Sequence, residues 1–135
     1  MTLDQICETW APRLLSVLRI MTALVILQYG LTKLFGFPYL EDLSNQTAFS
    51  LYWDAAIFEF VCGTLVLIGL FTRYAAFILS GETAFAYFID HAPNGFFPLQ
   101  NDGNLPVMFC FVFLYLAAAG GGPWSLDALL KSRRV

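Results

Sequence analysis

Four long apolar runs, separated by short polar stretches, dominate the chain. Each run approaches the roughly 20 residues that an α-helix needs to cross a bilayer. Turn-forming residues end the runs, with Gly36 and Pro38 after the first and a Gly-Gly-Gly-Pro sequence at residues 120–123 after the fourth. The expected fold is all-α, a four-helix transmembrane bundle that residues 1–135 form as a single domain, since no repeat or linker divides them. The predicted spans are about residues 12–35, 51–70, 73–91 and 105–121.

The composition favours a membrane protein over a soluble domain. Only 13% of the residues are charged, 59% are hydrophobic, and the mean hydropathy is +0.67. A soluble domain has roughly 25% charged residues, so this chain has too few to cover a surface that faces water. The net charge of −3 and the absence of a basic patch exclude a nucleic acid as partner and leave the lipid bilayer. The first residues carry acid rather than the basic stretch of a signal peptide, so the first apolar run is expected to remain as an anchor.

The basic residues predict the orientation in the membrane. Lysine and arginine concentrate at the N-terminus, between the second and third runs, and at the C-terminus, whereas acidic residues dominate the other two connections. Because loops rich in Lys and Arg stay in the cytoplasm, both termini are expected on the cytoplasmic side. The residues that carry this prediction are Arg13, Arg73, Lys131, Arg133 and Arg134.

Three ionisable side chains, Arg19, Glu59 and Glu82, interrupt the apolar runs. A charge at the centre of a span costs about 2.5–3.5 kcal/mol, so neutral residues would be expected there unless the charge has a role. A rise of about 1.5 Å per residue places Arg19 roughly 10 Å, Glu82 roughly 13 Å and Glu59 roughly 18 Å from the cytoplasmic side. We therefore expect the three to meet in one interior layer, where Arg19 bridges the carboxylates or neutralises one of them. Such a group could hold a proton, bind a ligand carbonyl or pass a proton on; the alternative is a polar clasp that fixes helix packing.

A second polar group is expected near the outer surface. Lys33 lies at the outer end of the first run, with Gln28 and Tyr29 about one turn below it. The third run brings Asp90 and His91 to the same level, and Asn101 and Asp102 follow in the loop. Lys33 either joins this group or extends to the interface, and His91 either binds a ligand or is a solvated helix-end residue. A single histidine without carboxylates at helical ligand spacing does not form a metal site, so none is expected.

Several sequence motifs resemble the DoxX family of small four-helix integral membrane proteins. They lie at residues 18–20, 28–38, 59–76, 91–101, 110–120 and 124–127. The resemblance covers nearly the whole chain beyond Pro12 and implies a multi-pass protein of the bacterial inner membrane. Glu82 is not among the polar positions that the family shares. Those positions fall here on Arg19, Lys33, Glu59, Arg73, His91, Asn101 and Asp127.

The resemblance also implies a link to quinone-dependent oxidoreduction, because some family members take part in it. We therefore expect a quinone-associated or redox-complex membrane subunit that binds a quinone between its helices. It would exchange electrons with a redox partner protein, since no cofactor motif or complete catalytic motif is present, and a second copy of the chain is a further candidate partner. The alternatives are a non-enzymatic assembly partner and, less favoured, a carrier of protons or a small solute. The candidate ligand-binding or proton-handling residues are Arg19, Gln28, Tyr29, Lys33, Glu59, Glu82, His91 and Asn101.

Overall fold

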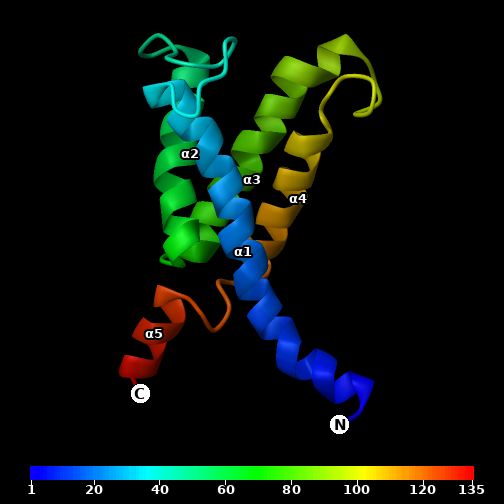
Figure 1. Ribbon diagram of the computed structural model, residues 1–135, viewed down its shortest axis with the longest axis vertical. Coiled ribbons are helices and arrows are strands. Elements are labelled where there is room, and N and C mark those ends of the chain that lie inside the picture. Colours follow the sequence, from blue (N-terminus) through cyan, green and yellow to red (C-terminus); the bar gives the residue numbers. More distant parts are fainter.

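The computed structural model describes residues 1–135 and contains helices but no strand (Figure 1). The all-α prediction is confirmed, and a helix occupies each of the four apolar runs. Two helices, α1 and α2, are long and apolar enough to cross a membrane, and α4 is a shorter apolar helix. The elements are α1 (Leu3–Phe35), α2 (Leu51–Ile68), α3 (Thr72–Ala86), the π-helix η1 (Tyr87–His91), the 3₁₀-helix η2 (Ala92–Asn94), α4 (Asn104–Ala119) and α5 (Leu126–Arg133).

Helix α1 begins at Leu3 and not near Pro12, where the apolar run starts. The reason is a capping box: the Thr2 hydroxyl accepts a hydrogen bond from the Gln5 N–H, and the Gln5 side chain accepts one from the Thr2 N–H. Pro12 removes one hydrogen bond from the helix interior, and the N-terminal part of α1 leans away from the other helices (Figure 1). At about 1.5 Å per residue, the 33 residues of α1 extend well beyond a hydrocarbon layer about 30 Å thick.

The helices pack as two pairs, α1 with α2 and α3 with α4, and α2 joins the pairs through its contact with α3. The pairs separate toward the end that carries the loops at residues 36–50 and 95–103, and both termini lie at the opposite end (Figure 1). Small and apolar side chains fill the centre of the bundle. The most completely buried of them are Ala23, Ile26, Ala56, Val66, Ala75, Ala76, Leu79, Phe113 and Leu116.

Gly30 allows α1 and α2 to approach closely at the level of Glu59. A Cβ atom on Gly30 would lie 3.0 Å from the Phe60 backbone nitrogen and 3.2 Å from the Glu59 Cβ atom. Contacts this short leave no room for a side chain at residue 30. The glycine therefore allows the close approach that fixes the position of α1 along α2. Lys33 is one helical turn beyond Gly30 on α1, and this contact therefore brings it to Glu59.

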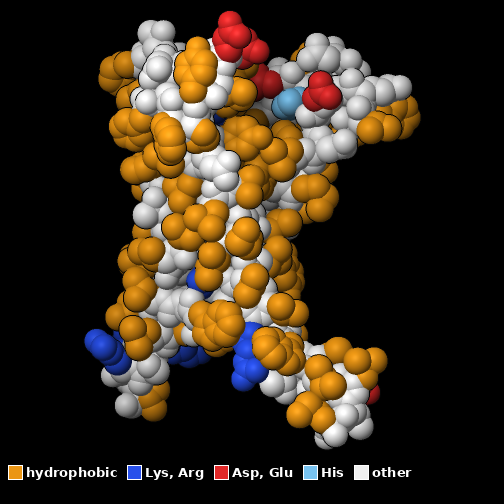
Figure 2. Space-filling view, viewed as in Figure 1, with side chains coloured by type: hydrophobic (Ala, Val, Ile, Leu, Met, Phe, Trp, Pro, Cys, Tyr) orange, Lys and Arg blue, Asp and Glu red, His pale blue; other side chains and the backbone are white.

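The charges separate between the two ends of the bundle. Lys and Arg side chains gather at the end that carries the termini, and Asp and Glu gather mainly at the loop end, with an apolar belt between them (Figure 2). The pale blue side chain of the single histidine lies beside acidic side chains in the hollowed part of the loop end (Figure 2).

Candidate functional site

A buried ion pair joins α1 to α2 near the loop end. The Lys33 Nζ atom lies 2.7 Å from Glu59 Oε1, and the two side chains are only 8% and 5% exposed. This is the only ion pair in the structure. Lys33 therefore does not extend to the interface, and Glu59 is paired with Lys33 rather than with Arg19, because the close approach at Gly30 sets the height of the two helices.

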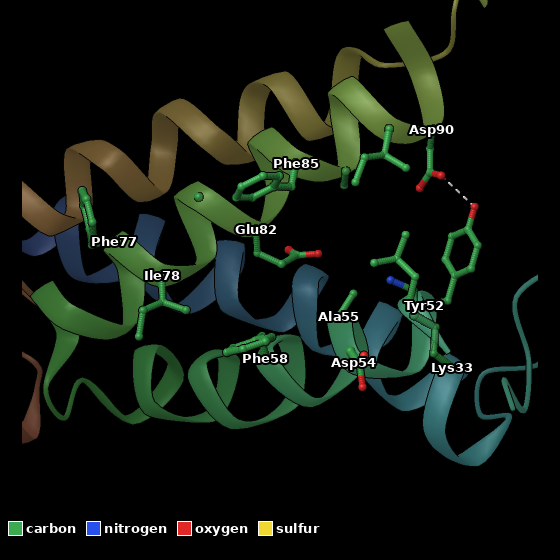
Figure 3. A pocket seen from close by; sticks show the side chains of 14 residues that line it. Lys33, Tyr52, Asp54, Ala55, Phe58, Phe77, Ile78, Glu82, Phe85 and Asp90 are labelled. Atoms are coloured by element: carbon green, nitrogen blue, oxygen red, sulfur yellow. Dashed lines mark hydrogen bonds between the residues drawn. The ribbon is translucent and has the colours of Figure 1, made fainter. Parts of the chain in front are cut away.

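Glu82 extends from α3 into the space between α3 and α2 (Figure 3). Its Oε2 atom is buried and has no hydrogen-bond partner, and the same is true of Glu59 Oε2. A buried polar atom without a partner costs about 1–3 kcal/mol, so structures rarely contain one without a reason. The two oxygens come from different helices, and Glu59 and Glu82 line one hollow together with Lys33, so a ligand or a proton could complete their bonding there.

Two hollows meet at Glu82 and Lys33. The first, which we call the interior cavity, has a volume of about 200 Å³ and includes Tyr29, Glu59 and His91 in its wall. The second, which we call the α2–α3 groove, has a volume of about 450 Å³ and lies between these two helices. The side chains along the groove are mostly apolar, while Glu82 and Lys33 lie where it reaches the cavity (Figure 3). The apolar residues that line the groove are Leu51, Ala55, Phe58, Phe77, Ile78, Phe85, Ala86 and Ile89.

Tyr52 and Asp90 link the two sides of this junction. The Tyr52 hydroxyl donates a hydrogen bond of 2.8 Å to Asp90 Oδ1, which connects α2 to the π-helix η1 (Figure 3). Both residues line the cavity and the groove. Sequence reasoning placed Asp90 in the outer polar group but did not predict its bond to Tyr52, although a tyrosine and an aspartate stand at the outer ends of two consecutive predicted helices.

The other residues predicted for the outer group separate into two sets. Tyr29 and His91 line the cavity, and the Tyr29 ring packs edge-to-face on Phe109 with the centroids 6.4 Å apart. Asn101 is 4% exposed and does not line the cavity, since its amide donates to the Gly95 carbonyl and accepts from the backbone N–H of Gly103. Gln28 is exposed and also lies outside the cavity.

Arg19 lies in a separate layer at the end that carries the termini, so the expectation that it meets both glutamates is wrong. Its guanidinium donates to the backbone carbonyls of Gly121 and Trp124, in the latter case at 2.7 Å. Arg19 and Lys33 are separated by about 20 Å of helix, and α2 runs antiparallel to α1. Gly69, which caps the C-terminus of α2, is therefore level with Arg19: a Cβ atom added to Gly69 would lie 2.6 Å from Arg19 Nη1. Glu59 is level with Lys33.

Two more of the polar positions that the family resemblance implies stabilise the same end of the bundle. The Asp127 carboxylate accepts hydrogen bonds of 2.9 Å from the backbone N–H groups of Phe71 and Thr72, and so caps the N-terminus of α3. Arg73 donates to the carbonyls of Ala117 and Ala118 at the C-terminus of α4. We call these two side chains, together with Arg19, the terminal clasp. It joins helix ends to backbone groups and lies apart from the cavity.

A family model described as DoxX matches residues 14–92. The chain belongs to the DoxX family. The matched segment holds Lys33, Glu59 and Glu82, and it ends just after His91.

The curated relatives of this DoxX-family protein are similar over most of their length. An uncharacterized protein of Haemophilus influenzae is 38% identical over 124 residues, which cover 89% of this chain and 92% of the relative. An uncharacterized membrane protein of Mycobacterium tuberculosis is 29% identical over 134 residues, which cover 86% of this chain and 80% of the relative. No solved structure matches the chain significantly. From the DoxX family membership and the Mycobacterium tuberculosis membrane protein among the relatives, we conclude that this is a membrane protein.

Proposed function

We propose that this DoxX-family protein is a quinone-binding subunit of a membrane redox system. The observation that carries the proposal is the pair of unpartnered carboxyl oxygens, Glu59 Oε2 and Glu82 Oε2, in a polar cavity that Lys33 also lines and that meets an apolar groove. A quinone combines a polar ring with a long apolar chain, and ligand sites typically combine an apolar slot with a few polar groups. The ring would occupy the interior cavity and the chain would follow the α2–α3 groove toward the surrounding lipid.

Each group of residues at the site has a separate role in this proposal. Lys33 and Glu59 form the fixed polar wall, Glu82 provides an acid that can exchange a proton with the ring, and the aromatic side chains of the groove hold the chain. The protein carries no cofactor motif of its own, so electrons would pass between the quinone and a partner protein. This agrees with what the family resemblance implies.

A second candidate, a non-enzymatic assembly partner, is favoured by the terminal clasp. All three of its side chains bind backbone groups, so charged positions shared within the family have a structural role here. In this alternative the Lys33–Glu59 pair would also serve only to join α1 and α2. The two candidates differ in what they predict for the groove.

Replacing Gly81 with leucine is expected to lower the amount of quinone bound by at least about tenfold without lowering stability. A Cβ atom on Gly81 would meet no atom within 4 Å, and the residue lines the groove, so a leucine would fill space that the ligand chain needs. The substitution also removes a helix glycine, which favours the folded state by up to about 1 kcal/mol. Quinone extracted per mole of purified protein, together with the melting temperature, measures both effects.

The matched control is Thr64→Leu, which adds an apolar side chain at an exposed position of α2 outside the groove. It is expected to retain the wild-type quinone content. If wild-type protein from native membranes contains no quinone and gains no thermal stability from added quinone, the proposed function is wrong. If Gly81→Leu binds as much quinone as wild type, the α2–α3 groove does not bind the apolar chain of the quinone.

We also propose that α1, α2, α3 with η1, and α4 cross the bacterial inner membrane, with both termini in the cytoplasm. The basic residues at the end that carries the termini and the acidic residues at the loop end support this orientation (Figure 2). The continuous helical segment from Thr72 to His91 supports the third crossing, since α3 alone has 15 residues and η1 extends it toward the length that a span needs.

The native cysteines provide a test of this topology. Cys7 is exposed near the N-terminus, Cys62 is buried in α2, and Cys110 is half-buried in α4. A thiol reagent that cannot cross membranes is expected to label inside-out vesicles and not intact spheroplasts. The label should disappear in Cys7→Ser, and labelling of intact spheroplasts at Cys7 would reverse the proposed orientation.

A further inference from the structure

We propose that the end of the bundle that carries the termini binds the phosphate group of an anionic phospholipid. The site is a hollow of about 330 Å³ between the start of α3, the glycine segment at residues 120–122 and α5, which we call the terminal hollow. It lies at the opposite end of the bundle from the interior cavity (Figure 1). The inference goes beyond the proposed function and does not depend on it.

The terminal hollow has an excess of positive charge. Its charged side chains are Arg73, Lys131 and Asp127. Neither Arg73 nor Lys131 forms an ion pair, whereas both carboxylate oxygens of Asp127 already accept backbone N–H groups. Two cations without a counter-ion, beside an acid that has its partners, favour an anion as ligand.

Several hydrogen-bond donors in the wall have no partner. The Thr72 hydroxyl is buried, forms no hydrogen bond and is directed toward the glycine segment, since a Cβ atom on Gly121 would lie 2.9 Å from Thr72 Oγ1. The N–H groups of Gly121 and Gly122 donate to no backbone carbonyl. Arg73 donates to the carbonyls at the end of α4 only through Nη1, which leaves Nη2 available. The oxygens of a phosphate group accept hydrogen bonds from all three kinds of donor.

Exposed aromatic side chains beside the terminal hollow match the rest of a phospholipid. Phe71 and Tyr74 line the hollow and are 60% and 75% exposed. One turn further along α3, Phe77 and Ile78 are also exposed. Acyl chains would pack on this face of α3 while the phosphate lies in the hollow. A soluble phosphate would leave the same face without a partner.

Helix α5 adds a second apolar surface at the same end. Leu126, Leu129 and Leu130 follow a three-four spacing and are exposed, while Lys131 is directed into the wall of the hollow. Lys and Arg side chains gather around this end of the bundle (Figure 2). Exposed leucines beside basic residues are typical of helices that lie at the surface of an anionic membrane. We therefore assign the phosphate to a lipid of the leaflet that faces this end.

The test measures lipid binding by native mass spectrometry. Protein freed of native lipid in detergent is titrated with dioleoyl phosphatidylglycerol, which is anionic, and with dioleoyl phosphatidylcholine, which has the same chains and a zwitterionic head. The first phosphatidylglycerol is expected to bind at least about tenfold more tightly, since each basic side chain near an anionic surface contributes roughly a factor of five. Glycerol phosphate, which has no acyl chains, is expected not to bind at concentrations that saturate the site with lipid.

Two variants and a matched control locate the site. Lys131→Gln is expected to weaken phosphatidylglycerol binding about fivefold. Arg134→Gln removes the same charge from the end of α5 outside the hollow, and it should change the affinity by less than about twofold. Thr72→Val keeps the shape of the side chain and removes the unpartnered hydroxyl. It is expected to weaken binding at least about threefold without lowering the melting temperature in lipid-free detergent, a result that a purely structural role of Thr72 would not give.

Each contrary outcome overturns a stated part of the inference. Equal affinities for the two lipids overturn recognition of an anionic head. Equal losses in Lys131→Gln and Arg134→Gln, or wild-type binding in both Lys131→Gln and Thr72→Val, overturn the terminal hollow as the site. Binding of glycerol phosphate as tightly as phosphatidylglycerol overturns the assignment to a lipid. Gly81→Leu should bind phosphatidylglycerol like wild type, so the result is independent of quinone binding.

Discussion

Replacing Lys33 with methionine is expected to lower the free energy of unfolding by about 3–5 kcal/mol. Methionine retains most of the apolar stem of lysine but removes the ammonium group, so Glu59 would remain buried without its partner. The loss is large because removing one member of a buried ion pair leaves a charge that neither water nor protein compensates. Reversible unfolding in mixed micelles measures the change.

A double variant separates the ion pair from the packing around it. Lys33→Met combined with Glu59→Leu removes both charges, and we expect it to recover most of the stability lost in Lys33→Met, since hydrophobic replacement of a whole buried pair is often neutral. Lys131→Met is the control, because Lys131 is exposed on α5 and should change stability by less than about 0.5 kcal/mol. A double variant no more stable than Lys33→Met would contradict the assignment of the pair.

The same double variant distinguishes the two candidate functions. A protein whose charges only join α1 to α2 should work normally once stability is restored. A protein that binds a ligand at Glu59 should be stable and yet lack bound quinone, because the polar wall of the cavity is gone. Measuring stability and quinone content on one sample therefore separates the structural role of the pair from its role in binding.

The four helices of the apolar runs could be predicted from the sequence, because apolar runs ended by Gly and Pro leave few alternatives, whereas α5 and the start of α1 at Leu3 were not predicted. That Glu59 and Glu82 face the interior could also be predicted, since a charge in an apolar run avoids lipid. The partner of each charge could not. Counting residues gives a height along one helix, but the height of one helix against another depends on contacts such as that of Gly30 with α2. This is why Lys33, and not Arg19, is paired with Glu59.

Other features had weaker signals in the sequence. The partners of Arg19 are backbone carbonyls at Gly121 and Trp124, and carbonyls are present at every residue, so no pattern marks them. The bond between Tyr52 and Asp90 depends on the π-helical turn, whose spacing differs from that of an α-helix and is not visible as a periodicity. Long-range bonds to backbone groups and local changes of helix type are therefore the features that needed the structure.

Replacing Arg19 with methionine is expected to lower the free energy of unfolding by about 3 kcal/mol or more. Arg19 is 1% exposed and donates to two carbonyls of the segment between α4 and α5, and hydrogen bonds from a charged group are worth about 1.5–3 kcal/mol each. The substitution should release this segment from α1, so hydrogen exchange at residues 120–127 should accelerate more than exchange near Glu59.

Two further variants make this prediction specific. Arg19→Lys keeps the charge but lacks the planar fork that reaches both the Gly121 and Trp124 carbonyls, so an intermediate loss of stability is expected. Arg13→Met is the control: its guanidinium lies 5.1 Å from the Trp10 ring near the exposed N-terminal part of α1, and a loss below about 1 kcal/mol is expected. Equal losses of stability in Arg19→Met and Arg13→Met would contradict the role of Arg19 in the terminal clasp. Arg19 lies about 20 Å along α1 from Lys33. The quinone bound per folded molecule should therefore remain at the wild-type level in Arg19→Met, Arg19→Lys and Arg13→Met. This result is expected if the terminal clasp stabilises the fold and the interior cavity binds the ligand.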